Sequence, residues 1–206
     1  MAARWRRATS VLWRAALSMT LLVSVATLFA GEVASRLLPL QRAALAWVAS
    51  DFRLLGLEIV REGPDTALQA TAMLDHVIVL GERAVVPDQR GGFIVTTAIG
   101  TVLQPLALAL GLALAWPAGV REMALRLAIC AVLLLPLLLA DAPLYLAGSL
   151  WEMQLRAARS AESSLLVGWM HFLAGGGRLA LGLAAGAASI GLAAPRALSG
   201  RRDGSA

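Results

Sequence analysis

Long apolar and polar blocks follow one another along this chain, and the apolar blocks predict that parts of it lie in a lipid bilayer. Four segments are almost wholly apolar: Val11–Gly31, Ile94–Trp116, Leu125–Leu146 and Leu165–Ala194. A helix rises ~1.5 Å per residue, so each segment approaches or exceeds the length that crosses a hydrocarbon core of ~30 Å. The pattern predicts a membrane α-helical protein built as a four-span helical bundle.

The gap between the first and second segments, residues 32–92, is too long and too polar to be a simple loop. Within it, Leu37–Ser50 has apolar residues at helical spacing together with Trp47, which is typical of a helix at the membrane interface. From residue 52 onward the period changes to two, because Leu57 and Ile59 alternate with smaller or more polar neighbours. That alternation predicts a strand.

Turn signals divide this β region further. Gly63-Pro64-Asp65 predicts a turn before a second strand over Leu68–Leu80, and Gly81–Arg83 leads into a short third strand over Ala84–Val86. The expected unit is a small outward-facing β-hairpin or meander. So few strands are marginal alone in water, so the unit should rest on the preceding helix, the membrane surface or another protein. The sequence leaves open whether that helix covers the strand edges or an edge is offered to a partner.

Composition agrees with a membrane protein and excludes some functions. Hydrophobic residues make up 59% of the chain and the mean hydropathy is +0.74, above the usual range of soluble domains. All 18 basic residues are arginine, and they are dispersed along the segments that flank the apolar blocks. A dispersed pattern does not favour nucleic-acid binding, which needs a basic face. The single cysteine, Cys130, lies in an apolar run and excludes a disulfide within the chain.

The arginines also assign an orientation. Four arginines flank the first apolar segment on its N-terminal side and place that end in the cytoplasm by the positive-inside bias: Arg4, Arg6, Arg7 and Arg14. Alternation then places residues 32–92 and 148–163 outside, and the loop at 117–122 and the C-terminal tail, with Arg201 and Arg202, inside. We therefore expect a multi-pass protein of the bacterial inner membrane with both termini cytoplasmic.

The expected organisation has three parts. Residues 1–31 hold the cytoplasmic N-terminus and an uncleaved anchor, because the apolar stretch is long for a signal peptide and no good cleavage site follows it. Residues 32–92 form the outward helix and β unit. Residues 93–206 hold the remaining spans, an outward helix over 148–174 and the cytoplasmic tail.

Two ionisable residues lie in or beside the apolar blocks. Asp141 follows a run of leucines, and Arg178 follows the triplet Gly175-Gly176-Gly177. A segment of thirty residues is too long for one straight span, so we expect a break at the glycines, with a helix over Trp151–Leu173 before it. This places both ionisable groups near the outer interface, where Arg178 can snorkel and the two can pair and tie two helices together.

Other candidate motifs are structural. Gly182 and Gly186 form a GxxxG, which allows close helix packing in a bundle or with a partner. His76 and His171 have no second ligand at metal spacing, and no phosphate-binding or dinucleotide fingerprint occurs. We therefore expect no catalytic residues, no cofactor and no metal.

The order of parts resembles the exosortase H-associated membrane proteins, which are small accessory proteins of bacterial exosortases. The resemblance is carried by the anchor Val11–Gly31, the hairpin Phe52–Leu80 and the passage Gln89–Pro105 into the second span. That passage lacks the Asn-Pro…Tyr-Gly pattern of the family, and the accessories are not the peptidase, so no site residue transfers. The resemblance implies a helper in sorting or processing surface proteins.

These observations predict a non-enzymatic accessory or scaffold subunit of an inner-membrane envelope-biogenesis, protein-sorting or secretion complex. The alternative is a subunit of a transporter or channel, with Asp141 and Arg178 on its path. The expected partners are the lipid bilayer and other membrane subunits, with no nucleic acid. The residues expected to contact a partner lie in the hairpin and in the outward helix: Leu57, Ile59, Val77, Val79, Trp151 and Arg156.

Overall fold

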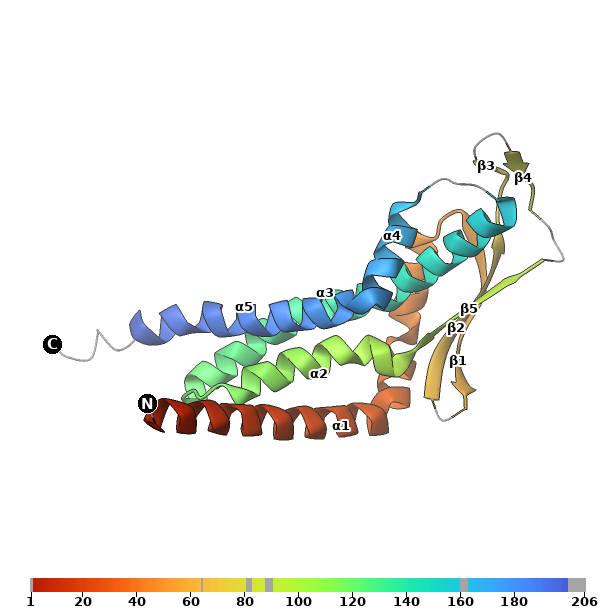
Figure 1. Cartoon of the computed structure of the whole chain (residues 1–206). Coiled ribbons are helices and arrows are strands. Elements are labelled where there is room, and N and C mark those ends of the chain that lie inside the picture. Colours follow the sequence, from red (N-terminus) through yellow and green to blue (C-terminus); the bar gives the residue numbers. More distant parts are fainter. Residues whose placement is uncertain (1, 64, 81–82, 88–90, 160–162, 200–206) are drawn as a thin grey trace. The chain divides into compact units, whose positions relative to one another are not determined.

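The computed structural model describes residues 2–63, 65–80, 83–87, 91–159 and 163–199 (Figure 1). Its helices are α1 (Ala2–Val48), α2 (Ile99–Ala115), α3 (Val120–Ala158), α4 (Leu165–Phe172), the π-helix η1 (Leu173–Gly177) and α5 (Arg178–Ser199). Its strands are β1 (Phe52–Glu62), β2 (Asp65–Leu74), β3 (Ile78–Leu80), β4 (Arg83–Val85) and β5 (Phe93–Ala98). The protein is therefore mostly helical, with a small antiparallel sheet.

The chain forms two compact units, which are described separately. The helical unit comprises Met1–Leu28, Leu103–Leu137 and Arg178–Ala206. The mixed unit comprises Phe29–Val102 and Leu138–Gly177 and holds all the strands. Helices α1, α2 and α3 contribute to both units.

Two helical stretches of the described chain are long and apolar enough to cross a membrane: Val120–Ala158 and Leu165–Ala194. A third is added if the two pieces of α1, Ala16–Ala26 and Leu28–Val48, are taken as one bent span. The helix α2 has only 17 residues. This supports association with a membrane, but the predicted four-span bundle is not confirmed.

The second apolar segment, predicted as helical from Ile94, begins differently. Its first residues form strand β5, and the helix begins only at Ile99. The reason is local, because Ile94, Val95, Thr96 and Thr97 are all β-branched and fit a pleated strand better than a helix.

The outward helices also differ from prediction. The helix expected over Leu37–Ser50 is present, but it is the end of α1, which continues through Pro39. The single helix expected over Trp151–Leu173 is wrong, because residues up to Ala158 belong to α3 and α4 starts at Leu165. Arg159 follows α3 with a φ of 52°. The break at the glycines is present as η1, where Gly176 has a φ of 104° that favours glycine.

The sheet of the mixed unit has the order β1-β2-β5, with every pair antiparallel. The β1–β2 hairpin closes at Gly63, whose φ of 62° is the left-handed conformation that this turn requires. A bulge between Leu54 and Gly56 inserts one residue into β1. Without it, Phe52 and Leu57 would lie on opposite faces, whereas both are buried.

The second strand is shorter than predicted. It ends at Leu74, and the next paired segment along the chain is the separate ribbon of β3 and β4. Arg53 forms an ion pair with Asp75 where β1 begins and β2 ends, and Nε2 of His76 lies 3.4 Å from Oδ1 of Asp51 there. The turn residues Gly81 and Glu82, and the tail residues Arg201 and Arg202, lie outside the described residues.

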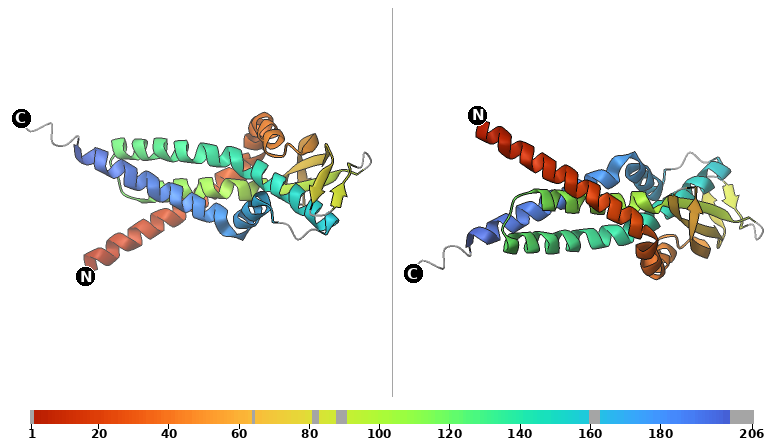
Figure 2. Two further views of the ribbon diagram at one scale, coloured as in Figure 1. Left: turned by 90° about the horizontal axis from the view of Figure 1, so that it is seen from above. Right: turned by 90° about the horizontal axis from the view of Figure 1, so that it is seen from below.

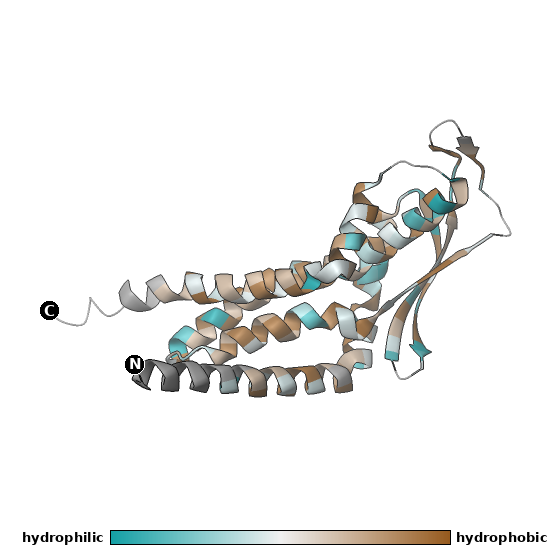
Figure 3. Ribbon diagram, viewed as in Figure 1, coloured by the Kyte–Doolittle hydropathy of each residue, from teal (hydrophilic) through white to brown (hydrophobic). Residues whose placement is uncertain are grey.

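The helical unit has a small apolar core. Ala109 of α2 packs with Cys130 and Leu134 of α3, and partly buried residues surround them, including Ala185 of α5. Figure 3 shows apolar residues predominating along α2 and α5. It also shows hydrophilic residues gathered at the end of the β1–β2 hairpin and at the C-terminal end of α3, both in the mixed unit.

Candidate functional site

The first pair of predicted contact residues lies in β1, and one of them is not on the surface. Leu57 is opposite Ala70 of β2, which is opposite Val95 of β5, and all three side chains are buried. Leu57 is only 5% exposed, so it stabilises the sheet and cannot contact a partner in this structure. Ile59, opposite Leu68, is half-buried.

The second pair, in and beside β3, is exposed. Val79 is 70% exposed, while its neighbours Ile78 and Leu80 are buried. Val77 is 52% exposed, and Val86, beyond β4, is also exposed. The ribbon therefore buries one face and presents valines on the other. Sequence reasoning did not identify Val86, although its β-branched side chain next to Pro87 was a usable signal.

The strand edges add to this surface. Both β1 and β5 are edge strands of the three-stranded sheet among the described strands. Leu55, at the bulge, and Ile94 of β5 are large exposed apolar side chains close to those edges. We call the exposed residues Leu55, Val77, Val79, Val86 and Ile94 the apolar β surface; they are distributed over the two edge strands of the sheet and the ribbon of β3 and β4. Edge strands and exposed apolar residues are features that other chains can pair with or cover.

Trp151 has a structural contact rather than an outward position. Its ring meets the ring of Phe52 edge-on, with 5.6 Å between centroids. Such pairs stabilise beyond simple burial, by about 0.5–1.5 kcal/mol. Trp151 therefore holds the start of β1 against α3 within the mixed unit.

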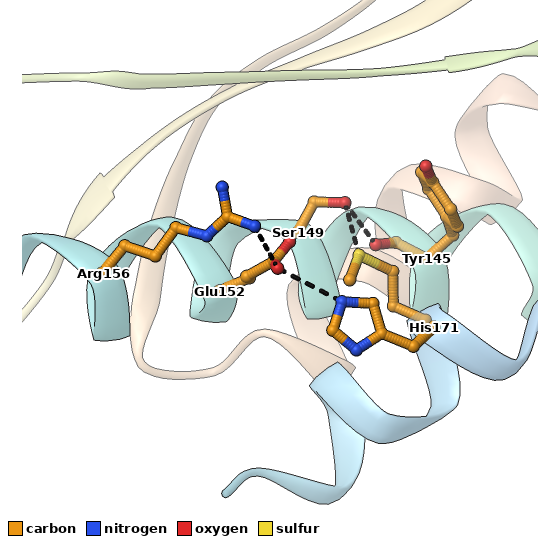
Figure 4. Close-up of polar contacts among 6 residues, drawn as sticks. Tyr145, Ser149, Glu152, Arg156 and His171 are labelled. Atoms are coloured by element: carbon orange, nitrogen blue, oxygen red, sulfur yellow. Dashed lines mark hydrogen bonds and ion pairs between the residues drawn. The ribbon is translucent and has the colours of Figure 1, made fainter. Parts of the chain in front are cut away.

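Arg156 belongs to a polar cluster between α3 and α4 (Figure 4). Its Nη2 donates to Oε1 of Glu152 at 2.6 Å, and Nε2 of His171 lies 3.2 Å from the same oxygen. The side chains of Arg156 and His171 are mostly exposed. One carboxylate that contacts two basic side chains on different helices links those helices. Sequence reasoning treated His171 as isolated because the nineteen-residue separation hides its contact with Glu152.

The same junction is packed closely beside this cluster. Ser149 Oγ donates to the carbonyl oxygen of Tyr145 and contacts Sδ of Met170 (Figure 4). A Cβ atom added at Gly148 would lie 2.6 Å from both the carbonyl oxygen of Leu166 and Cβ of Met170. Figure 2 shows α4 beside the second half of α3 from two directions. Gly148 thus allows the helices to meet.

Gly148→Ala is therefore expected to separate α4 from α3 and expose the amides of α4. The added methyl group would meet backbone atoms, which cannot rotate away, and overpacking of this kind costs about 1–3 kcal/mol. Hydrogen–deuterium exchange of residues 165–172 would measure the effect. The matched control is Gly168→Ala in α4, where an added Cβ meets nothing within 4 Å. Equal exchange in the two variants would contradict this packing.

The two predicted intramembrane residues are both buried. Asp141 of α3 is 2% exposed and Arg178, the first residue of α5, is 6% exposed. Arg178 was expected to snorkel at the membrane surface, and its burial differs from that expectation. Asp141 lies in the mixed unit and Arg178 in the helical unit. Their pairing stays a prediction.

The glycines of the GxxxG motif lie against α2 inside the helical unit. A Cβ at Gly182 would lie 2.7 Å from Cα and from the carbonyl oxygen of Pro105. At Gly186 it would lie 3.1 Å from Cα of Ala109. Close approach to a backbone is the use of small residues that the motif predicts.

A buried ion pair in the helical unit was missed by sequence reasoning. Arg126 of α3 is 2% exposed; it donates from Nη1 to the carbonyl oxygen of Trp116 at 3.0 Å and from Nη2 to Glu122. Its Nε has no hydrogen-bond partner in the part of the chain that the structure describes. The signal available was the spacing of Glu122 and Arg126, four residues apart, but spacing does not reveal burial.

The described residues hold no group of three or more His, Cys, Asp or Glu side chains that could bind a metal ion. The chain matches no protein-family model, and comparisons with curated proteins and with solved structures find no match. The resemblance to exosortase-associated accessory proteins stays a prediction from the order of parts. The apolar β surface is the candidate site that remains.

Proposed function

We propose that this protein is a non-enzymatic accessory subunit of a bacterial inner-membrane complex for envelope biogenesis, protein sorting or secretion. In this proposal the apolar helices anchor the chain, and the β surface docks a partner protein or a nascent substrate. The single observation that carries the proposal is the apolar β surface beside two strand edges. Small soluble sheets rarely leave such a surface uncovered, because it promotes association.

The mixed unit supports this role by connecting the sheet to helices. Trp151 of α3 packs on Phe52 of β1, and Glu152 joins α3 to α4 through Arg156 and His171. A docking surface gains affinity when it is already ordered before binding, because less entropy is lost on association. The exposed valines of β3 and the edge of β5 or β1 would then bind by strand addition with apolar side-chain contacts.

Val79→Asp tests the proposal. The tagged full-length protein is purified from native membranes in mild detergent, and co-purifying proteins are identified and quantified. We expect a larger complex with the wild type and a several-fold loss of the partner with Val79→Asp. Val79 is exposed, so the substitution should leave folding intact, which matching gel-filtration profiles in the absence of partner would check.

The matched control is Arg121→Ala, at an exposed position of α3 in the helical unit, because it makes the same change of −1 in net charge away from the strands. It should retain the partner. Recovery of the wild type only as a lone monomer or homo-oligomer would contradict the proposal. So would equal loss of partner in both variants, which would indicate a charge effect.

The alternative function, a transporter or channel subunit, is favoured by one observation, the burial of two ionisable residues in apolar helices. Ionisable residues at membrane depth often mark ion or substrate paths. Under this alternative Asp141→Asn would abolish function while Val79→Asp would be tolerated. The reverse result supports docking.

A further inference from the structure

The second half of α1 has an exposed apolar face that the docking proposal does not use. Phe29, Arg36, Leu40 and Trp47 are separated by seven, four and seven residues, so they lie on one side of a helix with 3.6 residues per turn. All four side chains are exposed, Trp47 by 84%. We call Phe29, Arg36, Leu40 and Trp47 the α1 outer face.

The opposite side of the same helix is buried against the mixed unit and is partly polar. Gln41 is buried together with Ala34 and Leu45. The helix thus turns a polar side chain inward and its largest apolar side chains outward. Such an arrangement is unfavourable in water, because exposed Phe, Leu and Trp side chains lose the stabilisation that burial gives.

We propose that the α1 outer face lies in the headgroup layer of the membrane, with its apolar side chains against the upper acyl chains and Arg36 on lipid phosphates. The chemistry of the face selects this occupant. Tryptophan is enriched at the headgroup level, and a guanidinium binds phosphate through paired hydrogen bonds. In the structure Arg36 is paired with Glu32 at 3.4 Å, with both side chains largely exposed.

The same residues argue against a spanning position. Between Leu28 and Val48 the helix carries Glu32, Arg36, Gln41 and Arg42, too many polar groups for the hydrocarbon core. They suit a helix in the interface plane. Position along the chain agrees, because this segment directly follows the apolar stretch Ala16–Ala26 in the sequence. A chain that leaves the hydrocarbon core there reaches the headgroup layer next.

The inference rests on the membrane anchoring proposed above and not on the docking role of the β surface. Its test uses the full chain reconstituted in vesicles of phosphatidylcholine and phosphatidylglycerol. A polarity-sensitive fluorophore is attached at Leu40→Cys, on the face, or at Ala46→Cys, which is exposed on the flank. Unmodified protein serves as the blank, since Cys130 is buried.

Lipids that carry a nitroxide at the headgroup should quench the label at position 40 several-fold more strongly than the label at position 46. Lipids with a nitroxide in the middle of the acyl chain should quench the label at position 40 less than lipids with a nitroxide at the headgroup. Arg36→Gln should weaken the quenching at position 40 more in vesicles with phosphatidylglycerol than in phosphatidylcholine alone. Both lipids carry a phosphate, but only phosphatidylglycerol has a net negative charge, because choline neutralises the phosphate of phosphatidylcholine.

Three results would overturn the inference. Stronger quenching from mid-chain than from the headgroup would make this segment part of a span. Absence of quenching, with cross-linking between labelled positions of two copies, would make the face a protein interface. Failure of the protein to insert in vesicles at all would overturn the anchoring itself, whereas insertion without quenching would overturn this inference alone.

Discussion

Glu122→Ala is expected to lower the free energy of unfolding by about 3 kcal/mol, because it leaves the buried guanidinium of Arg126 without its counter-charge. The carboxylate of Glu122 is 22% exposed and Arg126 is 2% exposed, so the arginine bears most of the penalty. The hydrogen bond to Trp116 would remain, but a carbonyl cannot replace a carboxylate. Thermal unfolding in detergent, followed by circular dichroism, would measure the change.

A second pair in the same chain gives the matched control. Glu32 and Arg36 have the same order and the same spacing of four residues, but both side chains are largely exposed. Exposed pairs of this kind contribute at most about 0.5 kcal/mol. Glu32→Ala should therefore change stability little. Similar losses in Glu122→Ala and Glu32→Ala would contradict the burial of Arg126.

The double variant Glu122→Gln/Arg126→Met should be more stable than Glu122→Ala. Replacing both members of a buried pair with groups of similar volume removes the unpaired charge, and also removes the Nε donor that lacks a partner. If the double variant were the less stable of the two, the Arg126 side chain would be stabilising the fold even without its counter-charge, and this interpretation of the pair would be wrong.

Gly182→Ala is expected to destabilise the protein by about 1–3 kcal/mol although alanine is the better helix former. Its new Cβ would lie 2.7 Å from backbone atoms of Pro105, so α5 must move away from α2. Close packing at this contact would be lost, and the core around Ala109 and Cys130 would loosen with it. The midpoint of thermal unfolding in detergent would fall.

For the same substitution at position 191 of α5, we expect stability to rise instead of fall. An added Cβ at Gly191 meets nothing within 4 Å, so Gly191→Ala should raise stability by about 0.5–1 kcal/mol through helix propensity alone. Gly186→Ala, with its nearest contacts at 3.1 Å, should fall between the two. A common sign for positions 182 and 191 would contradict the α2–α5 packing.

Apolar patterning predicted some elements well and others wrongly, and the difference has a physical cause. The hairpin turn at Gly63 and the break at Gly175–Gly177 were predicted because glycine signals its backbone conformation locally. Strand β5 was taken for the start of a span because a short apolar run has no period that separates a buried strand from a helix. Its β-branched residues favour a strand, but hydropathy values do not distinguish β-branched residues from other apolar residues.

The candidate site shows the same limit. Val77 and Val79 were predicted as contact residues and are exposed, whereas Leu57, predicted with them, is buried. The bulge at Leu55 decides this, because one extra residue reverses which face each later residue occupies. The register of β1 on β2 depends on pairing between strands and cannot be determined from β1 alone.

The sequence by itself determined that the chain has apolar helices fit for a membrane, a β unit between them and glycines at its turns. These are properties of neighbouring residues, and local chemistry specifies them. The tertiary structure alone decided that Trp151 meets Phe52, that Glu152 meets His171, that Arg126 is buried and that Val79 is exposed. Each of these depends on which segments pack together, and contacts between distant segments leave no periodic signal in a single sequence.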